Sequence, residues 1–215
     1  LNLKEALIRA ITEMGYEQPS PIQEQAIPLI QQHKDVIGQS QTGSGKTAAF
    51  GLPILNELIP LDNRKTQALI LCPTRELCLQ VADEMRKFSK YIEGLRVVSV
   101  YGGQDINRQI KDIKGGSDIV VATPGRLLDH MRRRTLRFED CKQVVLDEAD
   151  EMLNMGFLDE IKDVFSNLPK DRQTILFSAT MPKPILELAN EILVDPVEVK
   201  IKNKTLTVEA IKQEA

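Results

Sequence analysis

The stretch "GQSQTGSGKT" at Gly38–Thr47 comes close to the phosphate-binding pattern G-x-x-x-x-G-K-[ST]. It differs in one position, because Ser40 stands where the pattern has glycine. In such a loop the backbone N–H groups converge on phosphate oxygens at the beginning of a helix. The curve is tightest at residues 43–45, next to the lysine, and we expect a small residue to fit at position 40 without special backbone angles.

Within this loop, Lys46 would reach the β- and γ-phosphates and Thr47 would ligate Mg²⁺. The alternative is a Gly-Ser turn that caps a helix and leaves the lysine exposed. A strand expected before the loop and a helix expected at Ala48–Leu58 favour phosphate binding. The residues that we expect around the phosphates are Ser40, Gln41, Thr42, Gly43, Ser44, Gly45, Lys46 and Thr47.

A second motif, which is acidic, follows an apolar run in the stretch "VVLDEAD" at Val144–Asp150. Asp147 would hold Mg²⁺ through water, as the aspartate on the second strand of a phosphate-loop enzyme does. Glu148 would lie near the γ-phosphate and orient or deprotonate the attacking water. The alternative is an acidic first turn of a helix, which is common because acidic residues favour helix N-termini.

Short apolar runs alternate with longer amphipathic segments along the chain. The amphipathic segments include Glu76–Ile92 and Lys183–Leu193, where apolar residues recur at three- and four-residue steps. This alternation predicts an α/β fold with a parallel sheet of about seven strands and helices on both faces. The expected strands are Asp35–Gly38, Ala68–Cys72, Arg96–Val100, Asp118–Ala122, Gln143–Leu146, Thr174–Phe177 and Val197–Ile201.

In a parallel sheet, the loops that follow the strands emerge at one edge, where ligands bind. The phosphate loop and the acidic motif both follow expected strands, although about 100 residues separate them. We therefore expect them to meet at one edge of the sheet.

Composition excludes several classes of protein. A chain of 215 residues with a formal net charge of −3 does not bind nucleic acid by bulk electrostatics, since such domains are usually strongly basic. Its three cysteines form no CxxC pair, and its two histidines are far apart, which argues against a disulfide framework or a His-based metal site. No run approaches the roughly 18 apolar residues of a membrane span. We expect a soluble, cytoplasmic, monomeric protein without membrane contact.

The acidic motif spells "DEAD", and the chain resembles the first RecA-like domain of the DEAD-box ATP-dependent RNA helicases. The resemblance covers residues 1–202 and leaves residues 203–215 as a linker or the start of a second RecA-like domain. The motifs that carry it, in the order of the family, are "GYEQPSPIQ" (15–23), "PTREL" (73–77), "TPGR" (123–126), "DEAD" (147–150) and "SAT" (178–180).

The resemblance implies that ATP and Mg²⁺ are the cofactors. Gln23 matches the glutamine that selects adenine, whose amide can pair with N6 and N7 but not with the two acceptors of guanine. Tyr16 would stack on the adenine ring. Without the family, the same segment is only a helix-starting turn with a half-buried aromatic residue. The aromatic residue that the family places about two positions before Leu1 lies outside this sequence, so nucleotide affinity is expected to be weaker.

The resemblance also implies that RNA is a partner, held by its backbone. The matching loops follow strands and open helices, where free N–H groups and arginines suit phosphates. Taken singly, these residues are ordinary turns and caps, and their expected common edge carries the interpretation. The positions implied are Pro73, Thr74, Arg75, Gly102, Gly103, Thr123, Pro124, Gly125 and Arg126.

Ser178 and Thr180 match the motif that connects ATP hydrolysis to strand separation in the family, with Asp150 as the expected hydrogen-bond partner. The alternative is a strand end capped by hydroxyl groups. The second RecA-like domain would supply arginine fingers and the other half of the RNA clamp, so it is the expected partner domain.

Three functions remain open from the sequence. The first is an RNA-dependent ATPase that separates short duplexes, and the second is an ATP-gated RNA clamp with little turnover. The third is another phosphate-loop enzyme, but a GTPase needs Asn-Lys-x-Asp and the nearest string, "NKTL" at 203–206, lacks the aspartate.

Overall fold

The computed structural model describes residues 1–61 and 65–202, so residues 203–215, expected to be a linker, lie outside the described part. Within these ranges the chain alternates strands and helices as expected. The strands are β1 (Val36–Gln39), β2 (Ala68–Leu71), β3 (Val97–Val100), β4 (Ile119–Ala122), β5 (Gln143–Leu146), β6 (Gln173–Ser178) and β7 (Val197–Lys200). The helices are α1 (Glu5–Glu13), α2 (Pro21–Gln31), α3 (Lys46–Glu57), α4 (Arg75–Phe88), α5 (Ile106–Lys114), α6 (Pro124–Arg132), α7 (Ala149–Asn154), α8 (Leu158–Ser166) and α9 (Lys183–Ile192).

All seven strands form one parallel sheet in the order β3-β4-β2-β5-β6-β1-β7. The expected fold class is therefore confirmed. Because the strands are parallel, their carboxyl ends share one edge. The order of the strands divides this edge into two halves. The phosphate loop, the acidic motif and the "SAT" motif follow β1, β5 and β6, whereas the three loops that resemble RNA contacts follow β2, β3 and β4.

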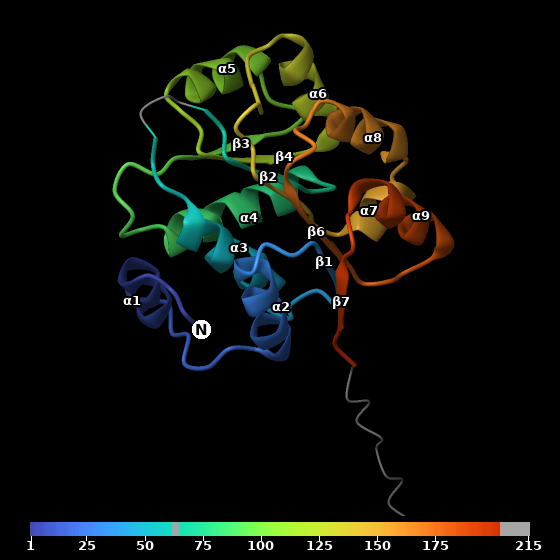
Figure 1. Ribbon diagram of the computed structural model, residues 1–215. Coiled ribbons are helices and arrows are strands. Elements are labelled where there is room, and N and C mark those ends of the chain that lie inside the picture. The colour runs from blue at the N-terminus through green and yellow to red at the C-terminus, as the bar shows by residue number, and fades with distance from the viewer. Residues whose placement is uncertain (62–64, 203–215) are drawn as a thin grey trace, which may run out of the picture.

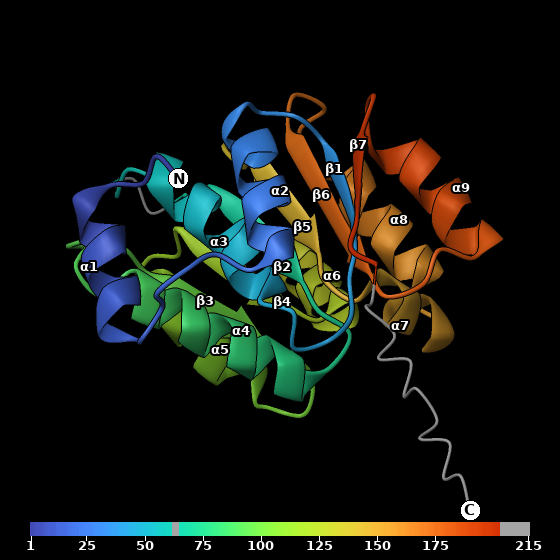
Figure 2. The ribbon, with the colours of Figure 1, turned by 90° about the horizontal axis from the view of Figure 1, so that it is seen from below.

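Helices cover both faces of the sheet (Figures 1 and 2). One core cluster joins the sheet to α1–α4, and the other joins it to α5–α9. Successive residues of a strand enter opposite clusters: Ile70 of β2 packs on the first side, while Leu69 and Leu71 pack on the second. This burial on both faces explains why the strands are apolar throughout rather than alternating.

The expected strand bounds agree with the structure to within one residue at each end. The helix of the phosphate loop begins at Lys46, two residues before the expected start. No helix in the described ranges combines the length and the apolar character that a membrane crossing requires.

Candidate functional site

The phosphate loop connects β1 to α3 through two glycines with left-handed backbone angles. Gly43 has φ +82° and Gly45 has φ +83°, a region that is strained for residues with a Cβ. Ser40 does not have a positive φ, which confirms that serine fits where the pattern has glycine. Its hydroxyl oxygen accepts a hydrogen bond from the Ser44 hydroxyl at 3.2 Å, a contact that glycine could not make. The altered position therefore braces the loop.

Lys46 points toward the acidic motif. Its Nζ lies 3.1 Å from Oδ1 of Asp147 and 3.1 Å from Oε1 of Glu148. Burial would lower the pKa of Lys46, but the two carboxylates outweigh burial and raise it. The two segments expected to meet at the sheet edge therefore do meet, with the lysine directed at the carboxylates instead of outward.

Asp147 is fully buried, at 0% exposure. Neither of its carboxylate oxygens accepts a well-aligned hydrogen bond from the residues that the structure describes, although Lys46 is close. Burial raises the pKa of Asp147, and Lys46 offsets this only in part. A buried carboxylate is costly unless cations or hydrogen-bond donors satisfy both of its oxygens, and Lys46 reaches only Oδ1, so this position is suited to a further cation.

Glu148 has a left-handed backbone, with φ +54° and ψ +53°, at the residue that precedes α7. A non-glycine residue adopts these angles only when its surroundings impose them, and such residues are concentrated at functional sites. The turn leaves the Glu148 side chain partly exposed beside Lys46, while Asp147 stays buried. Two adjacent carboxylates thus have different environments, as the separate roles expected of them require.

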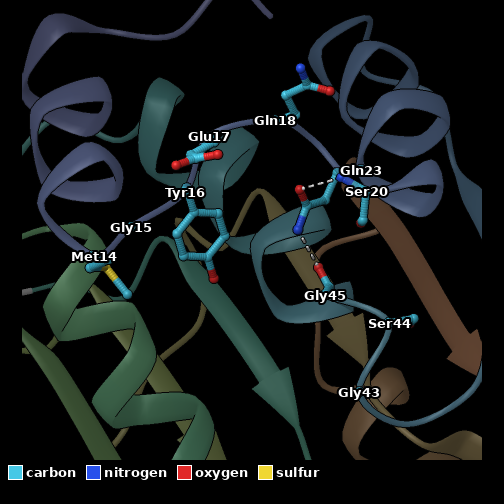
Figure 3. A pocket seen from close by; sticks show the side chains of 10 residues that line it. All are labelled: Met14, Gly15, Tyr16, Glu17, Gln18, Ser20, Gln23, Gly43, Ser44 and Gly45. Carbon is cyan, nitrogen blue, oxygen red and sulfur yellow. Dashed lines mark hydrogen bonds between the residues drawn. The ribbon is translucent and has the colours of Figure 1, made fainter.

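A pocket of about 620 Å³ adjoins the phosphate loop. Tyr16 and Gln23 line it together with residues 43–45 of the loop (Figure 3). The Gln23 side chain accepts a hydrogen bond from the Ser20 N–H at 3.0 Å and donates one to the Gly45 carbonyl at 3.1 Å. Gln23 therefore connects the beginning of α2 to the phosphate loop. Tyr16 makes an edge contact with Phe88 of α4, with ring centroids 6.2 Å apart.

The "SAT" motif and Asp150 are joined by hydrogen bonds. Asp150 accepts from the Thr180 hydroxyl at 2.8 Å and from the Thr180 N–H at 3.1 Å. The Ser178 hydroxyl accepts from the Asp150 N–H at 3.2 Å and donates to the Thr180 carbonyl at 2.7 Å. Burial would raise the pKa of Asp150, but the bonds from Thr180 and Ser178 outweigh it and lower that pKa. The expected partners are thus in contact.

The loops after β2, β3 and β4 lie on neighbouring strands, as their expected common edge requires. Arg75, Gly102, Gly103 and Gly125 are exposed. The structure does not support two candidates as contact surfaces: Pro73 and Pro124 are buried. Each proline belongs to the bend between a strand and a helix, and Pro124 is the first residue of α6, where its fixed φ suits the helix and no N–H is lost.

The remaining candidates in these loops are partly exposed. They are Thr74, Thr123 and Arg126. Thr74 caps α4, because its hydroxyl accepts a hydrogen bond from the Leu77 N–H at 3.2 Å. The Arg75 guanidinium lies 5.1 Å from the centre of the Tyr101 ring, which connects the loop after β2 to the end of β3.

Comparison with known proteins agrees with this geometry. The model of the DEAD/DEAH box helicase family matches residues 20–188, which is more than half of the chain. This chain belongs to the DEAD/DEAH box helicase family. It is 51% identical over 212 residues to the DEAD-box ATP-dependent RNA helicase CshA of Bacillus subtilis (strain 168), covering 99% of this chain and 42% of that protein. The protein of the same name from Geobacillus kaustophilus is also 51% identical, with 99% and 45% coverage.

Solved structures of family members have the same fold. A DEAD box protein from the hyperthermophile Methanococcus jannaschii superposes with a TM-score of 0.89 and 44% identity, over 94% of this chain and 55% of that one. A hypothetical ATP-dependent RNA helicase from Sulfolobus tokodaii gives a TM-score of 0.84 and 38% identity, over 93% and 57% of the two chains. The chain thus spans between two fifths and three fifths of the length of these proteins.

The residues present have the oxygen atoms that would hold Mg²⁺ together with a bound nucleotide. The described residues contain no group of three or more His, Cys, Asp or Glu side chains that could hold a metal. At nucleotide sites, however, Mg²⁺ is usually held by one or two protein oxygens, waters and the substrate phosphates. The unused buried oxygens of Asp147 and the half-buried Thr47, the second residue of α3, supply such oxygens.

Two groups of site residues were not identified from the sequence. Met14, Glu17 and Gln18 line the pocket but have no distinctive pattern beyond their place in the "GYEQPSPIQ" neighbourhood. Gln109 contacts Arg126 from within α5, where it belongs to no motif. Its only signal is a polar residue on the buried face of an amphipathic helix, which sequence alone does not distinguish from an exposed one.

Proposed function

We propose that residues 1–202 form the ATP- and RNA-binding RecA-like domain of an RNA helicase. In this proposal, ATP hydrolysis drives local separation of an RNA duplex when the chain acts with a second RecA-like domain of the same protein. The observation that carries it is the meeting of Lys46, Asp147 and Glu148 beneath the phosphate loop. Membership of the family and relatives named as ATP-dependent RNA helicases support the choice of reaction.

In the ATP half of the edge, each residue would contact a different part of the nucleotide. Tyr16 would cover the adenine ring and Gln23 would pair with its edge, while the N–H groups of the loop hold the phosphates. Lys46 would exchange its contacts with the two carboxylates for the β- and γ-phosphates. Bound Mg²⁺ would neutralise phosphate charge, held by Thr47 and Asp147. Glu148 would then orient the attacking water and accept its proton.

The RNA half would hold the sugar-phosphate backbone. Exposed loop N–H groups at helix beginnings, with Arg75 and Arg126, offer phosphate contacts that carry no sequence information. The net charge of −3 makes such local contacts necessary, since the whole domain does not attract polyanions.

The link between the two halves would run through the bonded trio Asp150, Ser178 and Thr180. These residues join the helix that follows Glu148, the proposed base, to the loop after β6. A change at Glu148 on hydrolysis would therefore be transmitted to the "SAT" loop. A monomer in the cytoplasm completes the proposal, in keeping with three buried, free cysteines in the described part of the chain.

The test is ATP turnover by the full-length protein with RNA, with DNA and with neither. We expect turnover to rise with RNA and to rise far less with DNA. Titration calorimetry separates binding from chemistry: Glu148→Gln is expected to keep ATP affinity within about threefold and to lose turnover, while Lys46→Ala loses affinity. Equal ATP affinity for the wild-type protein and Lys46→Ala would refute the phosphate-loop assignment, and equal stimulation by DNA would refute the RNA assignment.

A further inference from the structure

Gln109 is a buried polar residue whose position connects two of the proposed RNA-contacting loops. It lies in α5 with 1% of its surface exposed. Its Nε2 donates to the Tyr101 carbonyl at 2.8 Å and to Oε1 of Gln104 at 3.0 Å. Tyr101 and Gln104 flank Gly102 and Gly103, so this amide holds the loop after β3 from both sides.

The other end of the same amide faces α6. Its Oε1 accepts from Nη1 of Arg126 at 3.1 Å and lies 2.9 Å from Nε2 of His130. An amide side chain has two N–H groups and an oxygen with two lone pairs, and all four are used here. A flipped amide would place N–H groups against the arginine and its oxygen against the Tyr101 carbonyl. The orientation of Gln109 is therefore fixed.

His130 completes the buried group, at 0% exposure. Because Oε1 of Gln109 can only accept, Nε2 of His130 carries the proton. Burial, followed by the nearby Arg126, lowers the pKa of His130 to about 4, so the ring is neutral near pH 7. Its Nδ1, 2.7 Å from the Thr135 hydroxyl, then acts as an acceptor.

Arg126 is held on one side only. Its Nη1 donates to the Gln104 carbonyl at 2.8 Å as well as to Gln109, and its other N–H groups bond to no residue in the described ranges. The side chain is partly exposed at the beginning of α6. One nitrogen is thus anchored while the rest of the guanidinium remains available for an external anion.

We propose that Gln109 is a positioning residue that holds Arg126 and the Gly102–Gly103 loop in one arrangement, so that both engage the RNA backbone as a preorganised unit. The inference rests on the proposed RNA-binding function. Gln109 itself touches no RNA. Its contribution is to remove the freedom of a long side chain and of a glycine loop before binding, which otherwise opposes association.

A double-mutant cycle on the full-length protein tests this inference, with RNA affinity measured by fluorescence anisotropy in the presence of an ATP analogue. Gln109→Met retains the size of the side chain but removes all four hydrogen bonds. We expect it to weaken RNA binding about tenfold, in the range of a lost hydrogen bond to a charged group. In the Arg126→Ala background the same change is expected to weaken binding clearly less, by about threefold, because the part of its effect that acts through the arginine is absent and only the part that acts through the Gly102–Gly103 loop is left.

Each outcome has a distinct meaning. If Arg126→Ala binds RNA as the wild type does, the proposed function of this loop fails. If Arg126→Ala weakens binding but Gln109→Met does not, the positioning role fails and the RNA-binding role stands. Equal effects of Gln109→Met in both backgrounds also overturn the positioning role. His130→Phe is the matched control: it disturbs the same buried group without touching Arg126 and is expected to change RNA affinity less than twofold.

A measurement on the wild-type protein tests the inference even if Gln109→Met does not fold. With ¹⁵N-labelled histidine, the Nε2–H of His130 is expected to exchange slowly with solvent and to keep its chemical shift when RNA binds. His130→Phe identifies the signal. A shift or fast exchange of this proton on RNA binding would show that the buried group rearranges, which contradicts preorganisation.

Discussion

Lys46 and Asp147 form a buried ion pair in which only Lys46 has a second partner of opposite charge. Lys46 can also pair with Glu148, whereas the structure places no second cation beside Asp147 among the described residues. We therefore expect Lys46→Met to lower the free energy of unfolding of the nucleotide-free chain by about 2–3 kcal/mol at pH 7, because it leaves a buried carboxylate without a cation. Asp147→Asn leaves Lys46 paired and is expected to change that free energy by less than about 1 kcal/mol. Urea denaturation of both variants measures the difference.

The comparison of the two variants is its own control, since each removes one member of the same pair. Similar losses from both would mean that the pair stabilises the fold symmetrically. A loss only with Asp147→Asn would mean that the carboxylate is satisfied by groups other than Lys46.

His130 makes stability depend on pH in a predictable direction. Burial and Arg126 lower its pKa in the folded state to about 4 from the ordinary 6.5. Above pH 6.5 the ring is neutral in both states; between pH 6.5 and about 4 the unfolded chain takes up the proton first. The free energy of unfolding is therefore expected to fall as the pH is lowered through this window, by about 3 kcal/mol at most.

Carboxylates that titrate near pH 4 also make stability depend on pH. The contribution of His130 is therefore measured as the difference between the wild type and a variant without this histidine. Denaturation at pH 7.5 and at pH 4.5 is compared for the wild type and His130→Phe. The variant is expected to lose less stability between the two values. An identical loss would show that His130 is not buried as a neutral group.

The phosphate loop offers two glycines with nearly the same backbone but different surroundings. A Cβ at Gly43 would meet nothing within 4 Å, whereas one at Gly45 would lie 2.5 Å from Nε2 of Gln23. Gly43→Ala is expected to lower the free energy of unfolding by about 1 kcal/mol from backbone strain alone. Gly45→Ala adds the clash, displaces Gln23 from the loop, and is expected to weaken ATP binding at least tenfold more than Gly43→Ala.

Calorimetric titration with ATP, alongside denaturation, checks both parts of this prediction. Gly156→Ala, at a glycine outside the loop with φ +84° where a Cβ also meets nothing within 4 Å, serves as the control for backbone strain alone. Equal ATP affinity of the two glycine variants in the loop would mean that the bond between Gln23 and the Gly45 carbonyl does not shape the nucleotide pocket.

Strands and loops could be predicted from the sequence because their signals are local. An apolar run such as Ala68–Leu71 has to be covered on both faces, and a glycine-rich turn before a helix has few alternatives. The contacts around Gln109 could not be predicted, because Arg126 and His130 lie 17 and 21 residues away and carry no pattern that pairs them with it. The direction of Lys46 toward the two carboxylates could not be predicted either, because the motif describes a loop with phosphate bound.

At the scale of the whole molecule, the strand order separates the proposed ATP-binding loops from the proposed RNA-binding loops along one edge of the sheet. The loops of β1, β5 and β6 form the proposed ATP half of the edge, and those of β2, β3 and β4 form the proposed RNA half. The parallel pairing of β2 with β5 joins the two halves at the middle of the sheet. Both halves open outward at the same edge, so a second RecA-like domain placed across that edge would contact nucleotide and RNA together.

This arrangement predicts that the 215-residue chain alone is a poor catalyst. It holds the proposed base, lysine and metal ligand, but an arginine contributed from a second domain is worth about 10³–10⁵ in rate in related phosphoryl transfer. We expect the isolated chain to bind ATP–Mg²⁺, to hydrolyse it at least about 100-fold more slowly than the full-length protein, and to show no stimulation by RNA. Steady-state turnover of both proteins, with and without RNA, measures this, and Glu148→Gln in each sets the background. RNA-stimulated turnover or duplex unwinding by the isolated chain would mean that one RecA-like domain completes the site unaided.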